Sequence, residues 1–357
     1  MGSIDLVPLI LGSFVTTAGG AVIGAISTAG WRSRVLWGIA VFTLSSLGCA
    51  LSQSVGQLVL FRLMQGMSSG ASMVVARAII RDMFPPADAQ RVMSQVTIYF
   101  GVAPAVAPVV GGLLLVHLGW HAIFIFLTLV GAALWGLSYR LLPETLHVTQ
   151  VQPFHARHLL KGYWEMASSP RFLALALASG VPFNGMFLYI LSAPVFLGEL
   201  LGLPPTHFFF LFMLTIGGIM GGAFLSGRLA GKMTARKQIR IGFTIMFSVA
   251  TLNLLLNVLF KAQPLWALPP IGIFSFGWAL MVPVVTLLVL DQVPHRRGMA
   301  SSLQACIGSL ANAFVAGVIS PLVMHSAVAL ALASLLMSCI GLVAWIFVRN
   351  RLGTPVG

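Results

Sequence analysis

The stretch LFRLMQGMSSGA (residues 60–71) places an arginine, Arg62, within an apolar run that is typical of a membrane-spanning helix. Gly66 and Gly70 lie four residues apart on one helix face, where small residues let a neighbouring backbone approach closely. Arg62 and Gln65 are neighbours on the helix surface and are expected to face the interior of a helix bundle. A charge at membrane depth costs about 2.5–3.5 kcal/mol, and such residues usually mark a functional pathway. The alternative is that Arg62 snorkels to the outer interface.

Composition assigns the chain to the membrane proteins. Of its 357 residues, 58% are hydrophobic and only 8% are charged, whereas soluble globular proteins carry about 25% charged residues. The three cysteines lie far apart in apolar stretches, so they are expected to be core residues rather than a disulfide framework. The net charge of +13 comes from short basic clusters between apolar runs, which indicates membrane topology rather than a nucleic-acid surface. The sequence predicts no cofactor and no metal site.

Apolar runs of about 20 residues are the length that crosses a bilayer, and eleven such runs predict eleven membrane-spanning helices. The longest interruption, residues 140–170, is expected to be a cytoplasmic central loop. It divides an N-terminal half (1–139) of five helices from a C-terminal half (171–357) of six. The predicted spans cover residues 6–27, 34–52, 57–79, 92–116, 120–139, 171–195, 206–228, 236–260, 265–288, 297–320 and 326–348.

Lysine and arginine gather in alternate connections, which sets the expected orientation. One set of connections holds only Lys261, so the other set is expected to be cytoplasmic, together with the C-terminus. A basic loop that starts at Gly24 recurs from Gly222, as in a protein built from two repeats, but aligning the loops leaves one N-terminal helix without a counterpart. The basic set comprises residues 32–34, 77–91, 140–171, 228–240, 296–297 and 349–351.

The stretch GVAPAVAPVVGG (residues 101–112) combines two prolines with three glycines. Pro104 and Pro108 remove backbone donors and are expected to kink the helix. Gly101, Gly111 and Gly112 permit bending and close packing. In a membrane such breaks persist only where neighbours or a cavity satisfy the freed carbonyl groups. The motif therefore predicts a pivot, and a merely kinked structural helix is the alternative for either proline alone.

Five stretches resemble the drug:proton antiporters of the major facilitator superfamily, and in particular the bacterial bicyclomycin-resistance (Bcr/CflA) subfamily. They are RLMQG (62–66), AIIRDMF (78–84), APVVGG (107–112), FNGMFLYILSAPVFLGELLGL (183–203) and HRRGMASSLQ (295–304). The resemblance covers essentially the whole chain, which matches helices two to twelve of the family's twelve. It implies an all-α major facilitator fold, monomeric in the bacterial inner membrane. It also implies export of small organic compounds in exchange for protons, without enzymatic activity.

Two departures from the family pattern bear on proton coupling. The loop GAISTAGWRSR (24–34) has Thr28 where the family has an aspartate and Trp31 where it has a glycine, although Arg32 and Arg34 remain, with Asp82, as the cytoplasmic loop motif. The family's first helix, which often carries the proton-exchanging carboxylate, has no counterpart. None of the seven acidic residues is expected at mid-membrane. Two alternatives therefore stay open: a truncated or degenerate relative without transport, and a proton-independent facilitator.

The resemblance also implies roles for individual residues. Arg62 with Gln65 would tune the proton site, and residues 101–112 would form a seal and pivot. Substrate is expected near the midplane between the two halves. Aromatic and methionine side chains suit bulky organic molecules, and buried amides without a role are costly, although most such side chains merely pack. The candidate lining residues are Phe183, Asn184, Met186, Phe187, Tyr189, Gln304 and Asn312.

Two further stretches have a structural interpretation. The segment 147–166 contains three histidines, but the spacing of His155 and His158 is weak evidence for a metal site. An amphipathic connector at the level of the lipid headgroups is favoured for this segment. GGIMGG (217–222) lies within a predicted span and is interpreted as a helix-packing face rather than a phosphate loop.

Overall fold

The computed structural model describes residues 31–142, 156–204 and 207–349, which form helices and short connections without a β-strand. The predicted first span, residues 6–27, and Thr28 lie outside these ranges. Helices are the expected result, because in a bilayer each backbone N–H and C=O must find its partner inside the protein. All three cysteines are free, as their spacing predicts.

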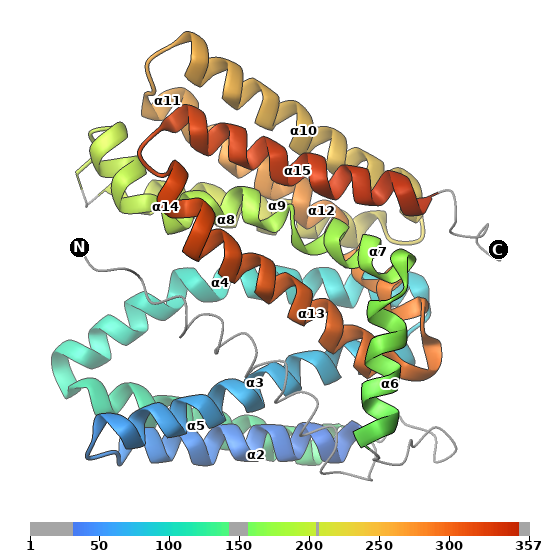
Figure 1. Cartoon of the computed structure of the whole chain (residues 1–357). Helices are drawn as coiled ribbons and strands as arrows, with labels where there is room; N and C mark the ends of the chain where they lie inside the picture. Colours follow the sequence, from blue (N-terminus) through green and yellow to red (C-terminus); the bar gives the residue numbers. More distant parts are fainter. Residues whose placement is uncertain (1–30, 143–155, 205–206, 350–357) are drawn as a thin grey trace.

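The N-terminal half contains four described helices: α2 (Trp31–Ala50), α3 (Val55–Met83), α4 (Pro86–Leu118) and α5 (Trp120–Leu141). In Figure 1, α2, α3 and α5 lie side by side, with α2 packed against both of the others. Ser54 caps α3 by accepting a hydrogen bond from the Gln57 N–H. Gly119, at φ 79°, makes the turn between α4 and α5, a conformation that glycine adopts without strain.

The C-terminal half begins with a broken span. The predicted span 171–195 is formed by α7 (Pro170–Gly180) and α8 (Phe183–Leu191), which meet at an angle of 42°. The π-helix η2 (Pro194–Leu200) follows. The break coincides with Pro182, which has no N–H to continue the helical hydrogen bonds.

The rest of this half is built around α12, most of which is buried against α9 and α10. In Figure 1, α10, α12 and α15 lie together, and α13 runs between this group and the N-terminal helices. The remaining elements are α9 (Phe209–Leu229), α10 (Ala235–Leu259), α11 (Pro264–Ala267), α12 (Pro269–Asp291), η4 (Pro294–Arg296), α13 (Arg297–Phe314), η5 (Val315–Ile319), α14 (Ser320–Val323) and α15 (Ala327–Arg349).

Ten of the predicted spans correspond to helices. Within the described ranges, eight helices are long and apolar enough to cross a membrane, or nine when α7 and α8 count as one broken span. In addition, the 33-residue α4 corresponds to the predicted span 92–116. The count of eleven stays a prediction, because the first predicted span lies outside the described residues.

The predicted central loop contains a helix, α6 (Ala156–Ala167), that is docked on the start of α13. The Ser302 hydroxyl donates to the Met299 carbonyl, so the Tyr163 hydroxyl, 2.7 Å away, donates to Ser302 Oγ. Burial raises the pKa of Tyr163, which keeps this donor protonated. Arg296 adds an ion pair to Glu165 at 2.9 Å. The connector is therefore fastened to the C-terminal half.

The glycines of GGIMGG bring α9 against the backbone of α12. A Cβ atom on Gly218 would collide with the carbonyl oxygen of Gly272, and one on Gly222 with the carbonyl oxygen of Phe276. A Cβ atom on Gly217 would meet no described atom within 4 Å. The packing interpretation of this stretch agrees with these contacts, since only residues without a side chain allow such close helix approach.

Gly218→Ala is expected to destabilise the folded protein by about 1–3 kcal/mol, because the added methyl group meets fixed backbone that cannot rotate away. Gly217→Ala is the matched control on the same helix, with an expected cost near zero. The thermal midpoint of each variant in detergent micelles measures the difference. Equal midpoints for the two variants would contradict the close contact between α9 and α12.

Candidate functional site

The two halves meet mainly where α4 packs on α9 and α3 on α13, and α12 also contacts both α3 and α4. Gly101 of α4 lies at the first contact, where a Cβ atom would come within 3.0 Å of Ile219 Cγ2. Gly111 and Gly112 have no described atom within 4 Å of such a Cβ. The backbone of α4 stays helical through Pro104 and Pro108. Of the three glycines in GVAPAVAPVVGG, Gly101 is therefore the one at a close contact with the other half, and the proposed pivot stays a prediction.

Ion pairs join the halves at one end of the molecule. This end, called the basic end, is where α3 and α12 finish and α4, α10 and α13 begin. Arg81 of α3 donates two hydrogen bonds to the Asp291 carboxylate of α12, at 2.7 and 3.0 Å. Asp82 of α3 pairs with Arg297 of α13, which also lies 3.7 Å from Asp291. These four side chains form a charge cluster that crosses between the halves.

A buried amide cluster closes the same end beside α4. Gln90 Nε2 of α4 donates to the Ser226 carbonyl at 2.9 Å and to Gln238 Oε1 at 3.0 Å. Gln238 Nε2 in turn donates to Ser226 Oγ and to the Leu280 carbonyl, each at 2.8 Å. Gln90, Ser226 and Gln238 are all buried. Buried amides are costly unless they are hydrogen-bonded, so this cluster favours the closed arrangement of the halves.

A cavity of about 270 Å³ lies between the halves, lined by residues of α3, α4, α7, α8, α12 and α13. On α3, α4, α12 and α13 the lining residues recur at helical spacing, so each of these helices presents one face to the cavity. On α4 these residues are Met93, Val96, Thr97 and Phe100. The volume is just below the range of about 300–1,000 Å³ that is typical of small-molecule pockets.

Gln304 belongs to a polar cluster in the cavity wall. The Ser179 hydroxyl donates to the Ala176 carbonyl at 2.9 Å, so Ser179 Oγ accepts the bond from Gln304 Nε2, also at 2.9 Å. This places the amide nitrogen of Gln304 and leaves its carbonyl oxygen, which is buried, without a partner among the described residues. The carbonyl oxygen of Asn312, two turns further along α13, is also buried without a partner among the described residues. A buried carbonyl without a donor costs about 1–3 kcal/mol.

Arg77 is the cation of the cavity wall. It lies on α3 between Met73, which also lines the cavity, and Arg81 of the charge cluster, at intervals of four residues on one helix face. Among the described residues, none accepts a hydrogen bond from its guanidinium group. Sequence reasoning counted Arg77 only as a marker of the cytoplasmic side. Its place in the last turns of the predicted span 57–79 was the signal that could have identified it.

Arg62 is stabilised without a described carboxylate. Its guanidinium donates to Gln65 Oε1 at 2.9 Å and lies over the Phe124 ring of α5, 4.6 Å from the centroid. Gln65 Nε2 donates to Ser46 Oγ of α2 at 2.7 Å. The predicted proximity of Arg62 to Gln65 is therefore present, and the pair ties α3 to α2 and α5. Neither residue lines the 270 Å³ cavity.

The seven predicted substrate residues fall into separate groups. Phe183, Gln304 and Asn312 line the cavity between the halves. Phe187 stacks on Phe183 with ring centroids 5.3 Å apart but does not line the cavity. Asn184 is fully buried, and its Nδ2 donates to the Gly180 carbonyl at 3.2 Å.

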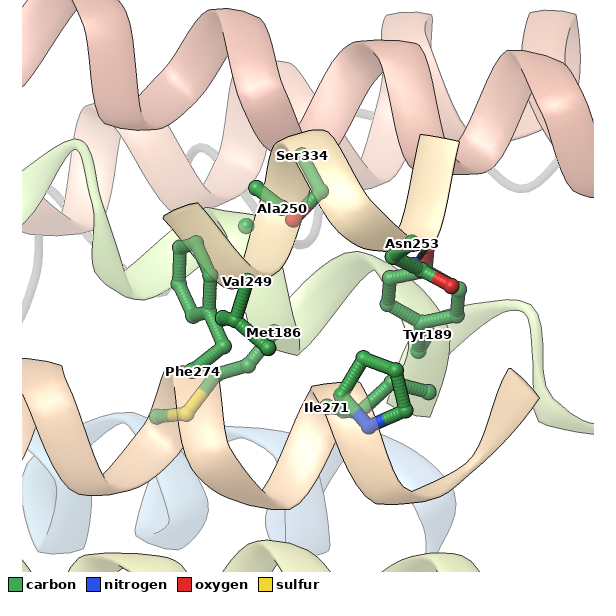
Figure 2. Close-up of a pocket in the computed structure, with 10 residues that line it drawn as sticks. Met186, Tyr189, Val249, Ala250, Asn253, Ile271, Phe274 and Ser334 are labelled. Carbon is green, nitrogen blue, oxygen red and sulfur yellow. Dashed lines mark hydrogen bonds between the residues drawn. The ribbon is translucent and has the colours of Figure 1, made fainter. Parts of the chain in front are cut away.

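The other two, Met186 and Tyr189, line a second and much smaller pocket inside the C-terminal half, where α8, α10, α12 and α15 meet (Figure 2). Asn253 Nδ2 donates to the Tyr189 hydroxyl at 2.8 Å. The pocket holds about 10 Å³, which is about the space of a single water molecule. It is too small for an organic substrate in this conformation.

The residues of the predicted loop motif serve two separate contacts. Arg32 donates to the Tyr139 carbonyl at 2.6 Å and lies 5.3 Å from the centroid of that ring, which ties α2 to the end of α5. Asp82 belongs instead to the charge cluster with Arg297. Arg34 lies in the first turn of α2, two residues after Arg32. No group of three or more potential metal ligands occurs within the described ranges.

Comparisons with known proteins agree with this architecture. The chain matches the model of the Major Facilitator Superfamily over residues 3–316. An uncharacterized MFS-type transporter of Bacillus subtilis, YdgK, is 31% identical over 310 residues, which are 86% of this chain and 76% of that protein. The bicyclomycin resistance protein homolog of Haemophilus influenzae is 26% identical over 329 residues, or 90% of this chain and 81% of that protein. The proton:xylose symporter XylE shares the fold, with a TM-score of 0.73 at 15% identity over 95% of this chain and 84% of that one.

This chain belongs to the major facilitator superfamily, as the resemblance of its motifs predicts. The predicted all-α major facilitator fold is confirmed. The protein is a multi-pass membrane transporter, and the expectation that it is not an enzyme is confirmed by the same family.

Neutralising Asp291 is expected to open the basic end. In a background without the native cysteines, Ala305→Cys places a thiol in the cavity wall. A membrane-impermeant thiol reagent applied on the side of the basic loops should label this thiol several-fold faster in Asp291→Asn, because Arg81 loses its partner, and faster still in Asp82→Asn/Asp291→Asn.

Asp88→Asn is the matched control, since the partner of Asp88 among the described residues is Arg91 on its own helix, where both side chains are exposed. It should leave the labelling rate unchanged. Equal rates in all variants would show that the charge cluster does not hold the basic end closed.

Proposed function

We propose that this protein exports small organic compounds across the bacterial inner membrane by alternating access of its two halves to the cavity between them. The observation that carries the proposal is the 270 Å³ cavity, which is lined from both halves and lies beside contacts between the halves at the basic end. Relatives named for bicyclomycin or multidrug resistance support export as the direction. The basic end then faces the cytoplasm, in keeping with the positive-inside rule.

The contacts between the halves suit a reversible closure. The ion pairs and the glutamine side-chain hydrogen bonds at the basic end can exchange protein partners for water when the halves rock apart. Phe183 and Gln304 contact the substrate in this scheme, together with Asn312. One chain supplies both halves, and a monomer is the proposed unit.

Coupling to protons is the finer part of the proposal. By resemblance the export is antiport with protons, with Arg62 and Gln65 beside the proton site. A specific observation favours the facilitator alternative: four of the five described carboxylates form ion pairs with arginines, the fifth, Glu199, lies 3.8 Å from His325, and none lines the cavity. A proton carrier in the described part of the chain would need to be released from such a pair.

The coupling is tested with purified protein in liposomes that contain a fluorescent aromatic compound. An imposed pH gradient without a membrane potential is expected to accelerate efflux several-fold in a proton antiporter and to leave the rate unchanged in a facilitator. Liposomes without protein give the leak. Efflux no faster than the leak under any gradient, for anionic, neutral and cationic probes alike, would contradict transport itself.

Arg62→Ala is expected to abolish this transport while leaving the amount of protein in the membrane intact, because it removes the cation from the contact with Gln65 and Phe124. Phe124→Leu keeps an apolar side chain but removes the ring under the guanidinium, and a partial loss is expected. Transport and membrane abundance are measured together. Unchanged transport by Arg62→Ala would contradict a functional role for this arginine.

A further inference from the structure

The described carboxylates all contact basic side chains other than Arg77. Asp82 and Asp291 belong to the charge cluster with Arg297 and Arg81. Asp88 pairs with Arg91 and Glu165 with Arg296, and Glu199 lies 3.8 Å from the exposed His325. Within the described ranges, the cavity wall therefore holds a permanent cation and no carboxylate to balance it.

The place of Arg77 on α3 keeps this charge away from the bulk water of the basic end. The helix continues for six residues beyond Arg77 to Met83, which is about 9 Å along the axis. Arg81 and Asp82 occupy the intervening turn and are engaged with the other half. A cation behind this closed cluster attracts an anion more strongly than one in open water, because screening is weaker.

The rest of the wall suits an amphipathic molecule. Phe183 and Trp278 pack with their ring centroids 5.0 Å apart, and both line the cavity with Phe100. Gln304 and Asn312, both in the cavity lining, each carry a buried carbonyl oxygen that lacks a donor among the described residues. The wall thus combines one cation, an aromatic surface and two hydrogen-bond acceptors.

We propose that the cavity binds an amphipathic organic anion, whose carboxylate or sulfonate pairs with Arg77 and whose aromatic body packs against Phe183 and Trp278. Hydroxyl or amide donors on the ligand reach the side chains of Gln304 and Asn312. The inference rests on the proposed function and gives it a substrate class. The guanidinium suits such a group because its planar N–H donors match two anionic oxygens at once.

An anionic substrate also allows export without a proton carrier among the described residues. The cytoplasm is at negative potential, so the membrane field drives an anion outward. The transport cycle then moves net negative charge, and its driving force is the potential itself. The lack of a carboxylate in the described cavity wall becomes part of the selectivity, because a fixed negative charge there would repel the substrate.

The test uses 2-naphthalenesulfonate, a permanent anion, and 2-naphthalenesulfonamide, a neutral compound of nearly the same shape. Binding to the purified full-length protein is measured by titration calorimetry. Protein-dependent flux is measured in liposomes, where valinomycin and a potassium gradient set the potential. We expect the sulfonate to bind more tightly than the sulfonamide, and its flux to follow the sign of the potential.

Arg77→Gln is expected to weaken sulfonate binding roughly 10- to 100-fold, the loss typical of a hydrogen bond to a charged group. Sulfonamide binding should change little. Arg77→Lys keeps the charge but loses the planar donors, so its affinity for the sulfonate should lie between those of the unchanged protein and Arg77→Gln. Arg91→Gln is the matched control, because it removes a cation from an exposed pair outside the cavity. The thermal midpoint of each variant confirms that it folds.

The outcomes separate the inference from the proposed function. Flux of both compounds with equal binding, unaffected by Arg77→Gln, overturns the anion site and leaves the transporter intact. Flux of the sulfonamide alone also overturns the anion site and leaves the transporter intact. Flux of neither compound, together with no binding, overturns the anion site. If the panel of anionic, neutral and cationic probes is also not transported, the proposed function fails as well.

Discussion

The need to stabilise positive charge on the helices of an apolar bundle organises this molecule, and α3 shows it most directly. This helix carries Arg62, Arg77 and Arg81, and each guanidinium has a different environment. Arg62 rests on an aromatic ring and an amide within the N-terminal half. Arg81 crosses to a carboxylate of the other half. Arg77 lines the cavity between the two halves. One helix therefore links the fold of its own half, the closure of the basic end and the candidate binding site.

The contacts within a half differ in kind from the contacts between halves. Inside the C-terminal half, α9 and α12 touch backbone to backbone at Gly218 and Gly222, where no side chain can intervene. Such contacts are rigid, because packed backbone cannot yield. Between the halves, ion pairs and the Gln90 amide cluster join surfaces that water could also satisfy. This division suits two rigid bodies that rock about their contact, the motion proposed for transport.

Features that depend on the spacing of residues along one helix are predictable from the sequence, whereas features that depend on how distant helices meet are not. The pairing of Arg62 with Gln65 and the packing role of GGIMGG follow from helix periodicity, and both contacts are present. The lining of the cavity depends on which faces of α3, α4, α12 and α13 meet, so only three of seven predicted lining residues lie there. Tyr189 shows the reason: its polar group is satisfied by Asn253 of a distant helix, which no local pattern reveals.

By itself the sequence determined the class of protein. Apolar runs of bilayer length, basic residues in alternate connections and the facilitator-type motifs set an all-helical membrane transporter, because the bilayer imposes these patterns on any chain that crosses it. The tertiary structure decided which polar residues act together. Arg81 and Asp291 are 210 residues apart in the chain and yet form one ion pair. Only the docking of the two halves brings such residues together, since contact across a bundle depends on helix rotation and depth, which hydrophobic periodicity leaves open.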